Sequence, residues 1–158
     1  TQMTVVLGAA SGGYCQYVRV IEGTTPIRYH VKAGTRRCLA RSTLGRVLLA
    51  MAPPDRRARL IAEGLAVWDG DEAPPLAEEV ARDVAQVAAR GHAFHAGLVN
   101  DNAAMLAIPL SFSLPARPLA LGLAAPKDLF RGRRAELLKI MRDVLGRLGS
   151  PGPARKTA

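Results

Sequence analysis

Aromatic residues, cysteines and long apolar runs are all scarce in this chain of 158 residues. No apolar run approaches the ~20 residues that are needed to cross a bilayer, and the first residues do not form the basic and then apolar pattern of a signal peptide. The two cysteines, Cys15 and Cys38, are too few for a disulfide framework and suit a reducing compartment. We therefore expect a cytoplasmic protein with no membrane contact.

Acidic residues are also few, and 13 of them against 22 basic residues give a net charge of +9. A basic balance is typical of proteins that bind nucleic acids, anionic surfaces or acidic ligands. The arginines are dispersed, however, and the three Phe, three Tyr and one Trp are not interleaved with them as a base-stacking surface requires. No helix-turn-helix spacing with a polar, exposed second helix is present. The sequence therefore gives no sign of a base-reading surface.

The first third of the chain favours strands and then a helix. Thr4–Leu7 and Tyr14–Ile21 are β-rich runs joined by a Ser-Gly-Gly turn, which predicts a hairpin, and Ile27–Val31 is expected to form a third strand. Ser42 suits the N-cap of a helix whose apolar residues recur at helical spacing until Pro53.

A block of helices follows, and then more strands and a final helix. Pro54 suits the first turn of a second helix, which Gly64 would close, and a third helix is expected between Pro75 and Gly91. The remaining expected elements are strands at 93–98, 103–110 and 118–123, a turn at 114–117, and a helix over 127–148.

This order of elements predicts an α+β fold in which helices pack against an antiparallel sheet. The last helix is expected to turn Leu137, Met141, Val144 and Leu148 toward the core. One domain would span residues 1–149, and residues 150–158 would be a disordered tail.

The sequence offers little that suggests catalysis or a cofactor. His92 and His95 are spaced three apart, but no cysteine or carboxylate cluster accompanies them as a metal site would require. Glu78 and Glu79 fall in the first helical turn, where they favour the helix dipole. No nucleophile elbow or phosphate-binding loop is present. We therefore expect no metal, no cofactor and no enzymatic activity.

Several segments together resemble one protein family. Residues 34–50, GTRRCLARSTLGRVLLA, resemble the signature of the ligand-sensing C-terminal domain of IclR-family bacterial transcription regulators. The resemblance continues in order through residues 14–21, the Arg-Gly-His-Ala of residues 90–93, residues 107–110 and the Ala-Ala-Pro of residues 124–126. It covers nearly the whole chain.

The resemblance implies a fold similar to GAF and profilin-like domains and a pocket for a small-molecule effector. Regulators of this family join the domain to an N-terminal winged helix, through which DNA is bound, and no such segment precedes Thr1. The chain is therefore expected to be an excised sensor domain that forms a homo-oligomer. By position, the pocket would be lined by Tyr29, Arg37, Thr43, Leu44, His95, Ala103, Met105, Gly122 and Ala124. Helix N-terminal amides suit an anionic ligand there.

The chain also departs from the family pattern in ways that bear on the ligand. Ala40 and Arg41 stand where a histidine is common, and small residues replace two hydroxyl residues in the last strand. The loss of these polar anchors favours a larger, more apolar or aromatic carboxylic acid as the effector. The alternative is a domain used only for oligomerisation, with Leu44 and Met105 filling the pocket. Either Arg37 or Arg41 would satisfy a bound carboxylate.

Overall fold

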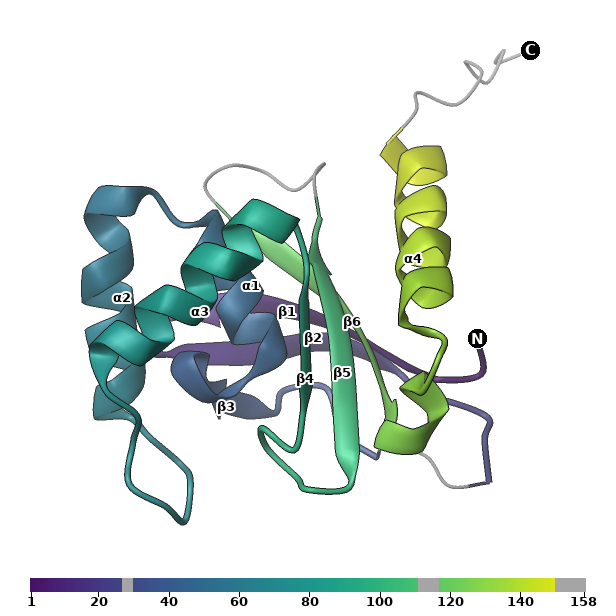
Figure 1. Cartoon of the computed structure of the whole chain (residues 1–158), viewed down its shortest axis with the longest axis horizontal. Helices are drawn as coiled ribbons and strands as arrows, with labels where there is room; N and C mark the ends of the chain where they lie inside the picture. Colours follow the sequence, from purple (N-terminus) through teal and green to yellow (C-terminus); the bar gives the residue numbers. More distant parts are fainter. Residues whose placement is uncertain (27–29, 111–116, 150–158) are drawn as a thin grey trace.

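The computed structural model describes residues 1–26, 30–110 and 117–149, and its centre is a six-stranded antiparallel sheet (Figure 1). The strands lie in the order β3-β2-β1-β6-β5-β4, so the first strand of the chain pairs with the last one. Their bounds are β1 Thr4–Ser11, β2 Tyr14–Ile21, β3 Arg36–Cys38, β4 Ala93–Ala96, β5 Ala103–Pro109 and β6 Leu119–Pro126.

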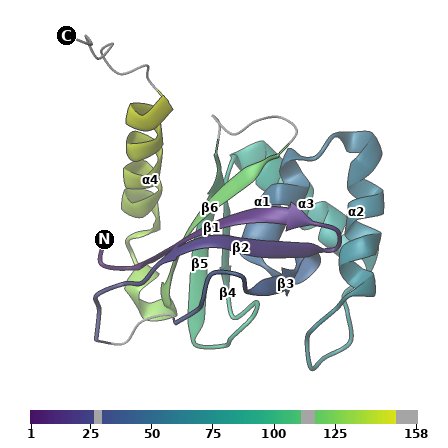
Figure 2. The same cartoon turned by 180° about the vertical axis from the view of Figure 1, so that it is seen from behind.

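Helices cover the two faces of the sheet unequally (Figure 1 and Figure 2). α1 lies against one face, with α2 and α3 packed outside it, and α4 lies alone on the opposite side. Their bounds are α1 Thr43–Met51, α2 Pro54–Ala66, α3 Ala77–Arg90 and α4 Arg134–Gly149, and short 3-10 turns at Leu39–Arg41 and Lys127–Phe130 precede α1 and α4. The predicted α+β class, with an antiparallel sheet between helices, is confirmed.

The β1–β2 hairpin forms as predicted, but the third strand does not. Gly12 occupies the left-handed region at φ 58°, which suits a two-residue hairpin turn. Of the expected strand at 27–31, residues 27–29 lie outside the described residues, and His30 and Val31 are not in a strand. Instead, Arg36–Cys38 pairs with β2 and forms one edge of the sheet. The basic segment before α1 is thus partly a strand.

Local signals set the ends of the helices on the α1 face. The Ser42 hydroxyl accepts a hydrogen bond from the Gly45 amide at 2.9 Å and caps α1. The prediction that Gly64 ends α2 is wrong, since the helix continues to Ala66. The Gly64 carbonyl instead accepts a hydrogen bond from the Cys38 thiol. Gly91 ends α3 in the left-handed conformation at φ 67°, as predicted.

The sheet separates two cores. Alternate residues of its central strands point to opposite faces, so Met105 and Ala107 face α1 while Leu106 and Ile108 face α4. β5 and β6 are covered on both faces, which explains their continuous apolar sequences. The turn expected at 114–117 lies outside the described residues except for residue 117, and the expected tail at 150–158 lies entirely outside them.

The buried face of α4 differs from the predicted one. Leu137 and Met141 are buried as expected, but the third contact is Leu145, whereas Val144 and Leu148 are 46% and 65% exposed. Positions 144 and 145 are both apolar, so the sequence pattern alone did not fix the rotation of the helix. The helix also begins at Arg134 rather than at residue 127, because a 3-10 helix at Lys127–Phe130 and a turn at residues 131–133 come first.

One close contact on the α1 side yields a stability prediction. A Cβ atom at Gly45 would lie 2.7 Å from the Cα atom of Leu39, in the turn before α1. We expect Gly45→Ala to lower the free energy of unfolding by about 1–3 kcal/mol or more, because backbone must move. At the matched helical position Gly146, a Cβ would meet nothing within 4 Å, so Gly146→Ala should be neutral or stabilise by up to ~1 kcal/mol. Urea unfolding of both variants measures the difference; equal effects would contradict the prediction.

Candidate functional site

A small cavity lies between the N-terminal end of α1 and the sheet. It has a free volume of about 30 Å³, enough for one or two water molecules. Its polar lining side chains supply three hydroxyls, an imidazole and an amide, and the remaining lining side chains are apolar. Its lining residues are Tyr17, Ser42, Thr43, His95, Leu98, Val99, Asn100, Ala103, Ala104, Met105 and Ala124.

Two glycines bring α1 close to the sheet at this point. Leu44 in the first turn of α1 packs over Gly8 of β1 and Gly122 of β6. A Cβ atom at either glycine would lie 3.3 Å from a methyl group of Leu44, and at Gly122 it would also lie 3.0 Å from the sulfur of Met105. The absence of these two side chains lets Leu44 and Met105 pack closely against the sheet, and we call this packed layer the floor of the cavity. The close packing explains why little free volume remains.

Thr43 and His95 line the cavity and begin a chain of four side chains from three elements, which Asp83 and Arg46 continue behind them; we call this chain the polar wall. Thr43 Oγ1 lies 3.3 Å from His95 Nδ1, and His95 Nε2 lies 3.1 Å from Asp83 Oδ2. Arg46 donates to the same carboxylate oxygen at 2.9 Å and to the Ala40 carbonyl at 2.6 Å. α1, α3 and β4 are thereby linked at the site.

Burial determines the protonation of His95. Desolvation lowers the pKa of His95 from its usual value of 6.5; the Asp83 carboxylate opposes this shift, and the Arg46 guanidinium adds to it. The imidazole is therefore neutral at pH 7, and one of its two ring nitrogens carries no proton. Arg46 is 6% exposed and is paired with Asp83, as buried charges need to be.

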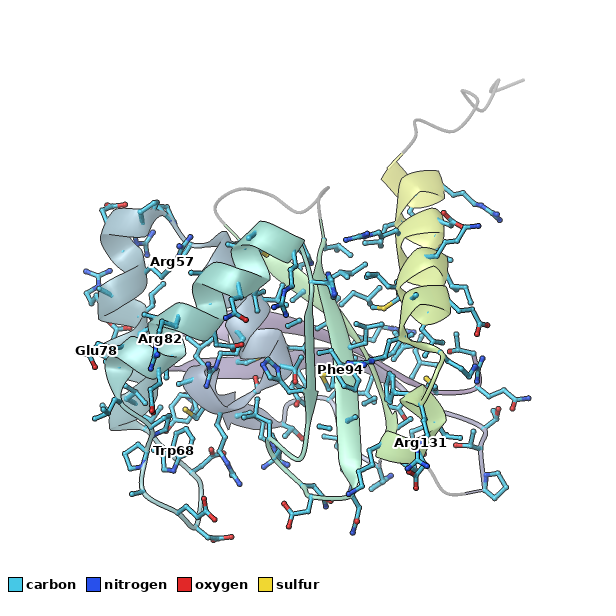
Figure 3. The ribbon with its side chains drawn as sticks, in the orientation of Figure 1. Arg57, Trp68, Glu78, Arg82, Phe94 and Arg131 are labelled. Carbon is cyan, nitrogen blue, oxygen red and sulfur yellow. The ribbon has the colours of Figure 1, made fainter. Side chains whose placement is uncertain are left out.

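A larger groove of about 750 Å³ adjoins the cavity and shares Leu98, Val99 and Asn100 with it. The loop after α2 and the loop between β4 and β5 form its walls. Arg41 joins these loops, because it donates to the Asp69 carbonyl at 2.8 Å and to the Val99 carbonyl at 3.5 Å. Its guanidinium also lies 5.8 Å from the ring centre of Trp68, which sits at the base of α2 (Figure 3).

The structure brings most of the sequence-predicted site residues together. Five of them line the cavity, namely Thr43, His95, Ala103, Met105 and Ala124, and Leu44 and Gly122 pack beside it. Arg37 lies on β3 outside this lining, and its Nε atom is buried without a hydrogen-bond partner among the described residues. Tyr29 lies outside the described residues.

Sequence reasoning missed the second half of the polar wall. Arg46 lies within the segment that resembles the family signature, and Asp83 carries little signal in the sequence, because the two residues are 37 positions apart and on different helices. An acidic residue facing inward on α3, between the buried Val80 and Val84, was the one available hint.

Other kinds of site find little support in the part of the chain that the structure describes. There, no three His, Cys, Asp or Glu side chains come together as a metal site would need. Burial raises the pKa of the Cys15 thiol to about 12, which leaves it protonated and a poor nucleophile. None of the described helices is long and apolar enough to cross a membrane.

Sequence comparisons and structural comparisons give different results. No family model matches the sequence, and neither does any curated protein. Among solved structures, the effector domain of the transcriptional regulator IclR from Acinetobacter sp. ADP1 superposes with a TM-score of 0.86 at 18% identity, over 96% of this chain and 88% of that one.

Two further structures extend the comparison to longer regulators. An IclR-family transcriptional regulator from Rhodococcus sp. gives a TM-score of 0.79 at 25% identity, covering 93% of this chain and 56% of its own. An IclR homologue from Microbacterium hydrocarbonoxydans, solved in complex with 4-hydroxybenzoate, gives a TM-score of 0.66 at 19% identity. This match covers 79% of this chain and 51% of that one. This chain thus spans about half of these two regulators.

The structures named above are transcription regulators rather than enzymes. More particularly, the chain has the fold of the IclR-family effector domain, as the resemblance in its sequence predicted.

The lowered pKa of His95 generates a pH prediction. The unfolded chain takes up a proton near pH 6.5, whereas folded His95 resists protonation, so the free energy of unfolding should fall as the pH drops below about 6.5. His95→Gln should reduce this loss between pH 7.5 and 5.5, and His92→Gln is the matched control. Chemical unfolding at each pH measures the free energy of unfolding. An identical dependence of this free energy on pH in wild type and His95→Gln would refute the prediction.

Proposed function

We propose that this chain is the effector-binding domain of an IclR-type bacterial transcription regulator and that it binds a small, apolar or aromatic carboxylic acid. The observation that carries the proposal is the likeness in fold to the Acinetobacter effector domain over 96% of the chain. The cavity under α1 supports it, because effector recognition needs a concave site with a few polar groups at one end.

The small free volume of the cavity supports a position for the ligand that extends beyond it. The cavity has room for the tip of a small molecule, and the adjoining groove has room for its body. The cavity lining contains no lysine or arginine, whereas Arg41 and Arg46 line the groove, together with Asp71, Glu72 and Asp101. Arg46 is paired with Asp83. A ligand carboxylate would therefore point toward Arg41 and share its guanidinium with the Asp69 carboxylate, which lies 3.5 Å away, with Thr43 and His95 at the opposite end of the ligand. Tyr29 and Arg37 remain candidates from the sequence.

Assembly and DNA binding complete the proposal. The chain spans about half of two longer regulators, and DNA would be bound through a winged helix outside the 158 residues. Effector binding would change the assembly of a homo-oligomer in the cytoplasm. The GAF-like description of the fold rests on the family resemblance.

The second candidate function is a domain that contributes only to oligomerisation. The observation that favours it is the packed floor, where Leu44 and Met105 leave about 30 Å³ free. The two candidates differ in one measurable property, which is whether any small acid stabilises the chain.

A thermal-shift titration tests ligand binding. We expect 4-hydroxybenzoate, benzoate or a medium-chain fatty acid to raise the Tm, because a ligand that binds only the folded state stabilises it by about 2.7 kcal/mol at 100 times its Kd. For a domain of this size that is roughly 5–10 °C. Benzamide serves as the uncharged control. If no acid shifts the Tm while sedimentation shows an oligomer, the oligomerisation function is favoured instead.

The position of Arg41 generates a second prediction about binding. Arg41→Met keeps the bulk of the side chain but removes the guanidinium, so it should weaken binding of the acid by about 1.5–3 kcal/mol, the value of a charge-assisted hydrogen bond. Arg37→Met is the matched comparison and should have the smaller effect. Isothermal titration calorimetry measures both. A larger loss for Arg37→Met would place the carboxylate beside β3 instead.

A further inference from the structure

The side chains of the polar wall fix the direction of its hydrogen bonds. A carboxylate only accepts hydrogen bonds, so the proton between Asp83 and His95 must belong to His95 Nε2, 3.1 Å from Asp83 Oδ2. Arg46, which only donates, lies 2.9 Å from the same oxygen and keeps the carboxylate ionised and in place.

The direction continues to Thr43. A neutral imidazole with a proton on Nε2 has a bare Nδ1, which only accepts. Thr43 Oγ1 lies 3.3 Å from this nitrogen, so the hydroxyl proton of Thr43 points at His95. Toward a second partner, the Thr43 hydroxyl therefore offers only the lone pairs of Oγ1, which accept hydrogen bonds.

This arrangement determines which ligand groups Thr43 accepts in the cavity. Thr43 lines the cavity and is 4% exposed, and His95 lines it as well. A carboxylate placed against Thr43 would face lone pairs, with no lysine or arginine in the lining to compensate its charge, and a buried unpaired charge is costly. A ligand hydroxyl or N–H group would instead donate to Thr43.

We propose that Thr43 is a specificity-determining acceptor for a hydroxyl or amino group of the effector, and that His95 is the positioning residue that holds the Thr43 proton away from the ligand. The effector class is then a hydroxy acid or amino-substituted acid, with the donor group in the cavity and the carboxylate in the groove. This inference rests on the proposed function, which specifies a carboxylate on the ligand but no second polar group.

The first test needs no ligand. ¹⁵N spectroscopy of the histidine side chains at pH 7.5, with His95 assigned by its absence in His95→Phe, reports which ring nitrogen carries the proton. We expect the Nε2–H form for His95 in the wild type and also in Thr43→Val. An Nδ1–H form or a doubly protonated ring in the wild type would overturn the inference.

The second test compares two probes of similar size, 4-hydroxybenzoate and 4-fluorobenzoate, by calorimetry. Wild type should bind the hydroxyl probe about tenfold more tightly, within the range of a neutral hydrogen bond. Thr43→Val should remove this preference and Thr43→Ser should keep it. His95→Phe should reduce it, because the Thr43 hydroxyl is then able to donate, whereas a merely structural role would weaken both probes equally.

The outcomes separate the two proposals. If both probes bind equally to wild type and to Thr43→Val, the acid-binding function stands and the role of Thr43 is refuted. If neither probe binds, the result counts against the proposed function, and the ¹⁵N spectra still decide the hydrogen-bond direction.

Discussion

The close approach of α1 to the sheet is the constraint on which the rest of the site depends. Leu44 reaches the floor because Gly8 and Gly122 have no side chains, and the helix then lies low enough for Thr43 to meet His95. The same approach lets Arg46, one turn along α1, reach the Asp83 carboxylate on α3. Packing and hydrogen bonding are therefore coupled, because a displaced helix would lose both the floor contact and the polar wall.

Much of the fold was predictable from local signals. The Ser42 cap, the left-handed Gly91 and the apolar runs of β5 and β6 each depend on residues close together in the sequence. The errors occurred where local signals were ambiguous or where distant pairing decided the outcome. Val144 and Leu145 fit a helix stripe equally well, and β3 is a strand only because β2 supplies its partner.

The candidate site divides in the same way. The family resemblance indicated the lining residues that belong to continuous motifs, such as Thr43 on α1 and Met105 on β5. It gave no indication of Asp83, because its importance arises from two partners that approach it only after α3 has docked on α1. Hydrogen-bond direction is likewise a property of the assembled network and not of any one residue.

The glycine floor also limits how such a site diverges. A binding site usually gains room when a lining residue becomes smaller, but Gly8 and Gly122 have no side chain left to lose. On this side of the cavity, extra space must therefore come from Leu44 or Met105, and a shorter side chain at either position also removes packing that holds α1 to the sheet. A lineage that deepens the cavity toward the sheet thus trades stability for volume at the same two residues.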